Sequence, residues 1–121
     1  MPEEYTGLVT ALKSLTQTEN GAEVTLPMAE DEWNTRPDVV SYGIVSLDFE
    51  ADALRGDDGK NTTSYEGSVD LFSLVKNGAG WVELITQTLV VHCEGSWSLN
   101  SHMYERATSL FHWEWTFEVS G

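Results

Sequence analysis

The chain has 121 residues, of which 20 are acidic and 6 are basic, so its formal net charge is −14. This length predicts a single domain over residues 1–121. The negative charge argues against a protein that binds nucleic acid tightly, because phosphate binding needs basic patches. Three explanations of the negative charge remain open: it keeps the protein soluble, it suits a salt-rich habitat, or it lets a surface stay near DNA without binding it. Composition alone does not distinguish between them.

The cysteine count and the lack of long apolar runs exclude further classes. The single cysteine, Cys93, rules out an internal disulfide and a CxxC-type metal site. No apolar run approaches the length of a membrane span, and Met1-Pro2-Glu3-Glu4 lacks the basic and apolar regions of a signal peptide. We therefore expect a soluble protein that folds in the cytoplasm and has no membrane partner.

The first third of the chain predicts a helix and then a short strand. Pro2 to Leu15 has a proline and acids in its first turn and one apolar stripe at helical spacing. Asn20-Gly21 is a turn signal that ends this unit. Glu23 to Met28 predicts a strand, with Val24, Leu26 and Met28 on one face. In the acidic loop that follows, we expect Trp33 to plug the edge of the core.

Two longer strands and a loop follow. Val39 to Glu50 and Tyr65 to Val75 alternate apolar with polar residues, which is typical of strands with one buried face. Phe72 and Leu74 interrupt the polar face of the second strand, so we expect that end to be covered. Arg55 to Ser64 is dense in turn formers and predicts a mobile loop that joins two antiparallel strands.

Acids cluster near the end of the first long strand. Asp48, Glu50 and Asp52 recur at alternate positions, on the face opposite Val45, Leu47 and Phe49. Such a set could gather a divalent ion, but alternate acids are more often the solvated face of a strand. Asp57-Asp58-Gly59 resembles a fragment of a calcium loop that lacks the alternating ligands and the closing Glu. We expect no metal and no cofactor.

Trp81 to Val91 predicts the second helix, with Asn77 as a candidate cap before it. Near its end, Cys93 is expected to pack as a small apolar residue. A first hairpin arm then leads to a turn around Tyr104 to Ala107. Four residues of this arm are predicted to share one face: Trp97, Leu99, Ser101 and Met103.

The last strand, Leu110 to Val119, has the clearest pattern. Its odd positions carry the aromatic side chains and its even positions are mainly polar, so one face is aromatic and the other is solvated. We expect Trp113, Trp115 and Phe117 to be buried between sheet and helices, because exposed rings without a partner invite aggregation. The alternative is an exposed binding platform. The whole order of elements predicts an α+β fold, a mainly antiparallel sheet of about four to five strands packed against two helices.

The sequence holds no catalytic constellation. It contains no HExxH, no GxSxG and no Walker-type glycine loop. Its histidines, His92, His102 and His112, fall on different predicted elements, and His112 has Glu114 as its neighbour on the polar face. His92 and Cys93 are adjacent, which is no evidence for a catalytic pair, because such partners meet through the fold. We expect no catalytic residue and no enzyme activity.

Several short motifs follow the amphipathic first helix in an order that is also found in a known protein family. They are Arg36-Pro37, Val40-Ser41-Tyr42-Gly43-Ile44-Val45, Glu66-Gly67-Ser68-Val69-Asp70-Leu71-Phe72, Tyr104-Glu105-Arg106 and Trp113-Glu114-Trp115-Thr116-Phe117-Glu118. This pattern, which runs through most of the chain, resembles the tail-terminator (tail-completion) proteins of long-tailed bacteriophages. The matching motifs are loose patterns of strand and turn, not chemical signatures.

The resemblance implies an α+β virion protein that assembles into a hexameric ring in the phage tail or neck. Such a ring stops polymerisation of the tail tube protein and offers a surface to head-completion or connector proteins. The family has no catalytic residues to carry over. The alternatives are another phage connector or tail-assembly protein, or a small enzyme or ligand-binding module that uses the aromatic face as a pocket.

Two sets of residues are candidates for the functional surfaces of such a ring, one for contacts between subunits and one for the channel. The first is an assembly loop, expected to become ordered when subunits meet: Arg55, Asp57, Asp58, Lys60 and Asn61. The second follows from the charge, because carboxylates lining a channel would repel passing DNA, whereas Lys or Arg would bind it. The candidate channel-facing acids are Asp48, Glu50, Asp57 and Asp58.

Overall fold

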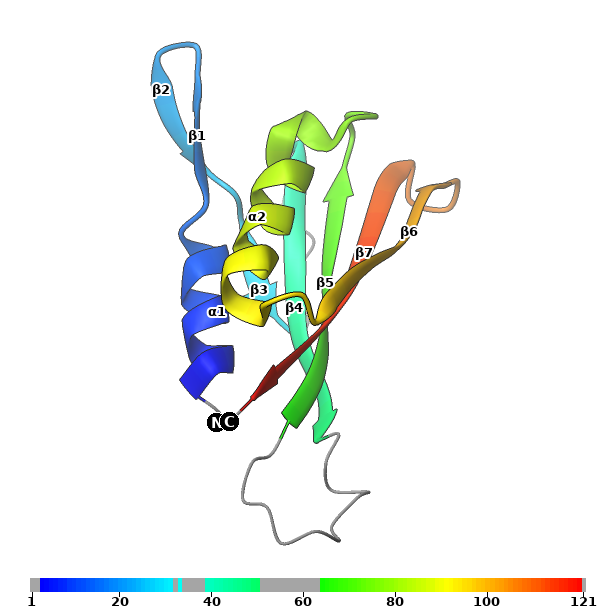
Figure 1. The fold of residues 1–121 in the computed structure, drawn as a ribbon. Helices are drawn as coiled ribbons and strands as arrows, with labels where there is room; N and C mark the ends of the chain where they lie inside the picture. Colours follow the sequence, from blue (N-terminus) through cyan, green and yellow to red (C-terminus); the bar gives the residue numbers. More distant parts are fainter. Residues whose placement is uncertain (1–2, 32, 34–38, 51–63, 121) are drawn as a thin grey trace, which may run out of the picture.

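Two helices lie side by side on one face of a five-stranded sheet, and a two-stranded hairpin extends beyond them (Figure 1). The computed structural model describes residues 3–31, 33, 39–50 and 64–120. The elements in chain order are α1 (Glu3–Lys13), β1 (Thr16–Glu19), β2 (Ala22–Thr25), β3 (Met28–Glu30), β4 (Ser41–Glu50), β5 (Ser64–Ser73), the short 3-10 helix η2 (Gly78–Gly80), α2 (Trp81–Cys93), β6 (Trp97–Glu105) and β7 (Leu110–Ser120). The predicted α+β class is confirmed, with seven strands where about four to five were predicted.

The main sheet has the strand order β3-β4-β5-β7-β6. β3 runs parallel to β4, and the other neighbouring pairs are antiparallel. β4 and β5 therefore form the antiparallel pair that was predicted on either side of the loop. β7 lies between β5 and β6, so the last strand of the chain is inside the sheet and β6 forms its edge.

The additional strands come from the segment between α1 and β4. Asn20 and Gly21 both have positive φ angles, 51° and 80°, which is the backbone of the tightest hairpin turns. This turn joins β1 to β2 in an antiparallel pair instead of ending the unit, as the sequence had suggested. Pro27, which lacks an N–H group, separates β2 from β3, so Glu23 to Met28 is not one strand.

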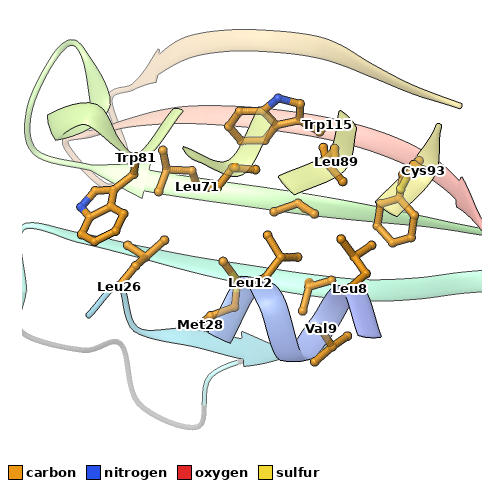
Figure 2. Close-up of a cluster of buried hydrophobic side chains, with 14 of the residues drawn as sticks. Leu8, Val9, Leu12, Leu26, Met28, Leu71, Trp81, Leu89, Cys93 and Trp115 are labelled. Carbon is orange, nitrogen blue, oxygen red and sulfur yellow. The ribbon is translucent and has the colours of Figure 1, made fainter. Parts of the chain in front are cut away.

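The core lies between the helices and the sheet. Apolar side chains of α1 and α2 meet those of β5 and β7, as Figure 2 shows for Leu8, Leu12, Leu89 and Trp115. Trp115 is fully buried, and its ring nitrogen donates a hydrogen bond to Thr86 Oγ1 at 3.2 Å. The core also takes in several further predicted residues: Tyr5, Ile85, Cys93, Trp113 and Phe117.

This burial confirms that the aromatic face of the last strand belongs to the core. Asn77 does not cap α2, as was predicted: its Oδ1 accepts a hydrogen bond from the Ala79 N–H group and caps η2, whereas the N-cap of α2 is Gly80, which has no side chain to cap it. Within the described residues, no helix is long and apolar enough to cross a membrane.

Two irregularities in strand pairing overturn predicted faces. In β6, the register shifts between Leu99 and Ser101, so Ser101 pairs with Glu114 and Met103 pairs with His112 on the polar face of β7. Ser101 and Met103 therefore do not share the face of Trp97 and Leu99, as was predicted. A bulge adds one residue on one strand, and everything beyond it changes sides.

The second shift lies in β4, between Leu47 and Phe49. Beyond it, Phe49 pairs with Glu66 and Glu50 pairs with Tyr65. The strict alternation that placed Phe49 with Val45, and Asp48 with Glu50, therefore does not hold along the whole strand. The side chains of residues 48–50 lie outside the described part of the structure.

Candidate functional site on the uncovered sheet face

The face of the main sheet that is turned away from α1 and α2 carries the polar half of each strand. We call it the outer face. Its residues on the three central strands are Tyr42, Ile44 and Ser46 of β4, Glu66, Ser68, Asp70 and Phe72 of β5, and Leu110, His112, Glu114, Thr116 and Glu118 of β7. No described strand of the chain contains a Lys or an Arg. The outer face is therefore acidic without basic partners on the same strands.

Carboxylates lie directly opposite one another on this face. Glu66 of β5 pairs with Glu118 of β7, and Asp70 pairs with Glu114. Like charges at directly opposed positions destabilise a sheet, typically by some tenths of a kcal/mol up to about 1 kcal/mol per pair. Two such pairs of opposed acids occur within five residues of β5, from Glu66 to Asp70. Taken alone, these two opposed pairs work against folding.

One histidine lies among these acids. His112 Nε2 is 2.6 Å from Asp70 Oδ1, and His112 Nδ1 is 2.9 Å from Glu105 Oε2. A neutral imidazole has one donor and one acceptor nitrogen, whereas two carboxylates require two donors. The geometry therefore fits the doubly protonated imidazolium, and the His112 pKa is raised, mainly by the hydrogen bond that His112 donates to Asp70 and against the effect of burial.

The register of three strands brings this cluster together. Asp70 comes from β5, His112 from β7 and Glu105 from β6. Phe72 lies directly opposite His112, so Asp70 is one pleat further along β5, at a diagonal position that a carboxylate can span. Glu105 approaches from the other side, next to Leu110. The histidine thus ties the edge strand β6 to the centre of the sheet.

A row of rings supports the imidazole. His112 stacks on Phe72 with ring centroids 4.3 Å apart, and Phe72 stacks on Tyr42 at 5.1 Å. Trp33 meets Tyr42 edge to face, and its Nε1 donates a hydrogen bond to the Gly43 carbonyl oxygen at 3.1 Å. Trp33 therefore packs on this outer row and does not plug the edge of the core, as was predicted. The end of this strand was predicted to be covered, but Phe72 is only half-buried and Leu74, beyond the end of β5, is exposed.

The geometry of the cluster limits its chemistry. Because both nitrogens of His112 face carboxylates, the ring has no free lone pair for general base catalysis or for binding a metal. Cys93 belongs to the core on the opposite side of the sheet, where burial raises the pKa of its thiol to about 11. The fold therefore does not join these two groups. Among the described residues, no group of three or more His, Cys, Asp or Glu side chains is placed to hold a metal ion.

The residues singled out from the sequence fall largely elsewhere. The assembly-loop residues Arg55, Asp57, Asp58, Lys60 and Asn61 lie outside the described residues. Asp48 and Glu50 belong to β4, but their side chains are also outside the described part. The outer face carries other acids, Glu66, Asp70, Glu114 and Glu118, none of which was predicted to face a channel.

The partners of His112 were also missed. The sequence indicated Glu114, two residues away on the same face, whereas the structure gives Asp70 and Glu105. Asp70 is 42 positions distant, so no local spacing could reveal it. The available signal was the alternation of polar residues in both strands. It predicted that Asp70 and His112 lie on solvated faces, but it did not predict that the two strands are neighbours.

No protein-family model matches the sequence, and no curated protein matches it either.

Proposed function

We propose that this protein is a ring-forming assembly protein of a long-tailed bacteriophage, a tail terminator that caps the tail tube and joins it to the head. The observation that carries the proposal is the outer face, where carboxylates oppose one another across β5 and β7 with no Lys or Arg on the strands. The order of elements and the −14 charge of the chain support the same function.

The physical argument concerns DNA that must pass through a ring without being held. Basic groups on the wall would bind phosphates and release counterions, so DNA would stick. Carboxylates repel the duplex, and salt screens that repulsion over about 8 Å at physiological ionic strength. We place the outer face toward the channel and the helices away from it. The opposed acid pairs then lower the stability of the subunit but serve the assembly.

The aromatic face of β7 supports this proposal over a ligand-binding module or enzyme. Such a module would need a pocket at Trp113, Trp115 and Phe117, but side chains of α1 and α2 fill that space. In the proposed ring, the partners are further copies of the chain, the tail tube protein and a head-completion or connector protein, and the location is the virion.

Sedimentation of the purified protein at several concentrations tests the proposal. We expect one discrete closed oligomer, and six copies of the 13.5 kDa chain would give about 81 kDa. Added to polymerising tail tube protein, this oligomer should end tube growth. A protein that stays monomeric at every concentration and leaves tube length unchanged would overturn the proposed function.

A further inference from the structure

The edge strand β6 is open on one side. It is the last strand of the main sheet and pairs only with β7 among the described strands. Soluble proteins usually protect such edges with charged residues or proline, but Trp97 to Tyr104 contains neither. Leu99, Met103 and Tyr104 are also 45%, 52% and 51% exposed. The bulge at Leu99/Ser101 interrupts the edge, yet regular pairing with β7 continues from Ser101 to Glu105.

An apolar groove lies beside the β1–β2 hairpin. It has a volume of about 460 Å³ and is lined by Leu26 and Pro27, by Val39 and Val40 ahead of β4, and by Val75 and Trp81. Val40 is 51% exposed, and Val39 and Val75 are exposed as well. The strands of the hairpin have no buried residue, so they add little to the core of their own subunit. The groove thus offers apolar surface that one copy of the chain leaves uncovered.

The hairpin beside the groove and the edge strand β6 lie on opposite sides of the molecule. In Figure 1 the β1–β2 hairpin stands at one side and β6 at the other, with β4, β5 and β7 between them. Two different surfaces that fit each other make a head-to-tail contact, which closes into a ring when the rotation between copies allows it. A contact between two identical β6 edges would stop at a dimer.

The charges of the two surfaces are complementary, which matters in a chain of net charge −14. The hairpin carries Glu19, at the rim of the groove, and Glu23, and it has no basic residue from Thr16 to Thr25. β6 is followed by Arg106, and its only acid, Glu105, is held by His112. A β6 edge approaching the groove therefore brings an arginine and no uncompensated carboxylate toward an acidic rim.

We propose that the groove beside the β1–β2 hairpin binds the β6 edge of a second copy of this chain. The Met103 side chain enters the groove, and Arg106 lies near Glu19 of the adjoining subunit. This inference deepens the proposed function, on which it rests, by naming the contact that closes the ring.

Charge substitutions test the contact by sedimentation equilibrium. Met103→Glu and Val40→Glu each place a carboxylate in the apolar contact, and we expect each to weaken self-association by about tenfold or more. The matched control is Val91→Glu on α2, where the side chain is 72% exposed and belongs to neither surface. Far-ultraviolet circular dichroism and thermal unfolding show that each variant is folded. Association that is equally strong in all four proteins would overturn the proposed contact.

Cross-linking separates the head-to-tail contact from other ways of associating. Met103→Cys and Val40→Cys are prepared separately and treated with a short bismaleimide, alone and mixed, with the wild-type protein as control for Cys93. We expect cross-linked dimers only in the mixture, and a ladder of larger species from a protein that carries both substitutions. Cross-linking of Met103→Cys alone would indicate paired β6 edges and would overturn the inference.

The two proposals can fail separately. A wild-type protein that forms rings and ends tube growth, but gives no cross-link in the mixture, would keep the proposed function and reject this contact. A wild-type protein that forms cross-linked open chains without ending tube growth would keep the contact and reject the proposed function.

Discussion

The two faces of the main sheet are built from the same strands and have opposite physical properties. On the face toward the helices, Val45, Val69 and Trp115 are fully buried in one continuous core. On the outer face, Glu66 and Asp70 alternate with those core residues along β5, and each lies opposite another acid. The first face explains why the chain folds. On the second face, the opposed acid pairs work against folding, whereas the stacked rings and the contacts of His112 with Asp70 and Glu105 support it.

The largest effect is expected on the helix-covered face. Trp115→Ala should lower the free energy of unfolding by about 3–5 kcal/mol, because a fully buried ring leaves a cavity and Thr86 loses its hydrogen-bond partner. Thr116→Val, one residue away on the outer face, should change it by at most about 1 kcal/mol. Denaturant unfolding of both variants measures the contrast. Equal losses would mean that the two faces do not differ in this way.

Two glycines give a second contrast, in which the expected changes in the free energy of unfolding are smaller and have opposite signs. A Cβ at Gly67 would clash with the Ser46 carbonyl oxygen and come within 2.5 Å of Phe117 Cζ, so Gly67→Ala should destabilise the protein by about 1–3 kcal/mol. At Gly7 in α1 the nearest such atom is 4.0 Å away, and Gly7→Ala should stabilise the helix by about 0.5–1 kcal/mol. Thermal unfolding measures both. A stabilising Gly67→Ala would disprove the close packing of β5 against β4 and β7.

The His112 cluster should make stability depend on pH. Its pKa is raised in the folded protein from an ordinary value of 6.5, so its contribution is complete below about pH 6.5 and disappears as pH rises through the folded pKa. The free energy of unfolding should therefore fall with rising pH in this window, and His112→Gln should remove that component. Urea unfolding of the two proteins between pH 5 and 9 provides the difference curve (about the range in which histidines titrate). A flat difference curve would contradict the imidazolium.

The smallest effect concerns the opposed acids. Glu118→Gln removes one charge of the pair with Glu66 and should stabilise the protein by about 0.2–1 kcal/mol, less at high salt. Glu83→Gln, at an exposed position in the first turn of α2, should bring no gain, because an acid there favours the helix dipole. Chemical denaturation at low and high salt measures both variants. A loss of stability in Glu118→Gln would show that the pair does not oppose folding.

Periodicity predicted most of the fold, and it failed where the backbone departs from regular geometry. The aromatic alternation of β7 and the apolar stripe of α2 are repeated signals, so their buried faces follow from the sequence. The bulges after Leu47 and Leu99 change the side on which later residues fall, and no residue at those sites announces them. Asn20-Gly21 did carry a hairpin signal, which the polar strands around it obscured.

The candidate site depended on strand order, which local patterns do not determine. Asp70 meets His112 because β7 pairs with β5, although β6 lies between them in the sequence. Glu105 joins them because the bulge in β6 places Met103 opposite His112. The polar character of each strand was predictable, whereas the directly opposed acids required the register.

The most direct test of the proposed function compares acids on the two sides of the sheet in the proposed ring. One variant changes Glu66, Glu114 and Glu118 of the outer face to Lys, and a control changes the exposed Glu4, Glu83 and Glu94 of the helix side to Lys. Each shifts the formal charge of a chain by six units, from −14 to −8. Fluorescence anisotropy then measures binding of a short DNA duplex.

The account predicts salt-sensitive DNA binding by the outer-face variant and none by the control or the wild type, because only the outer face would line the channel. Equal binding by the two variants, or binding by the control alone, would contradict it.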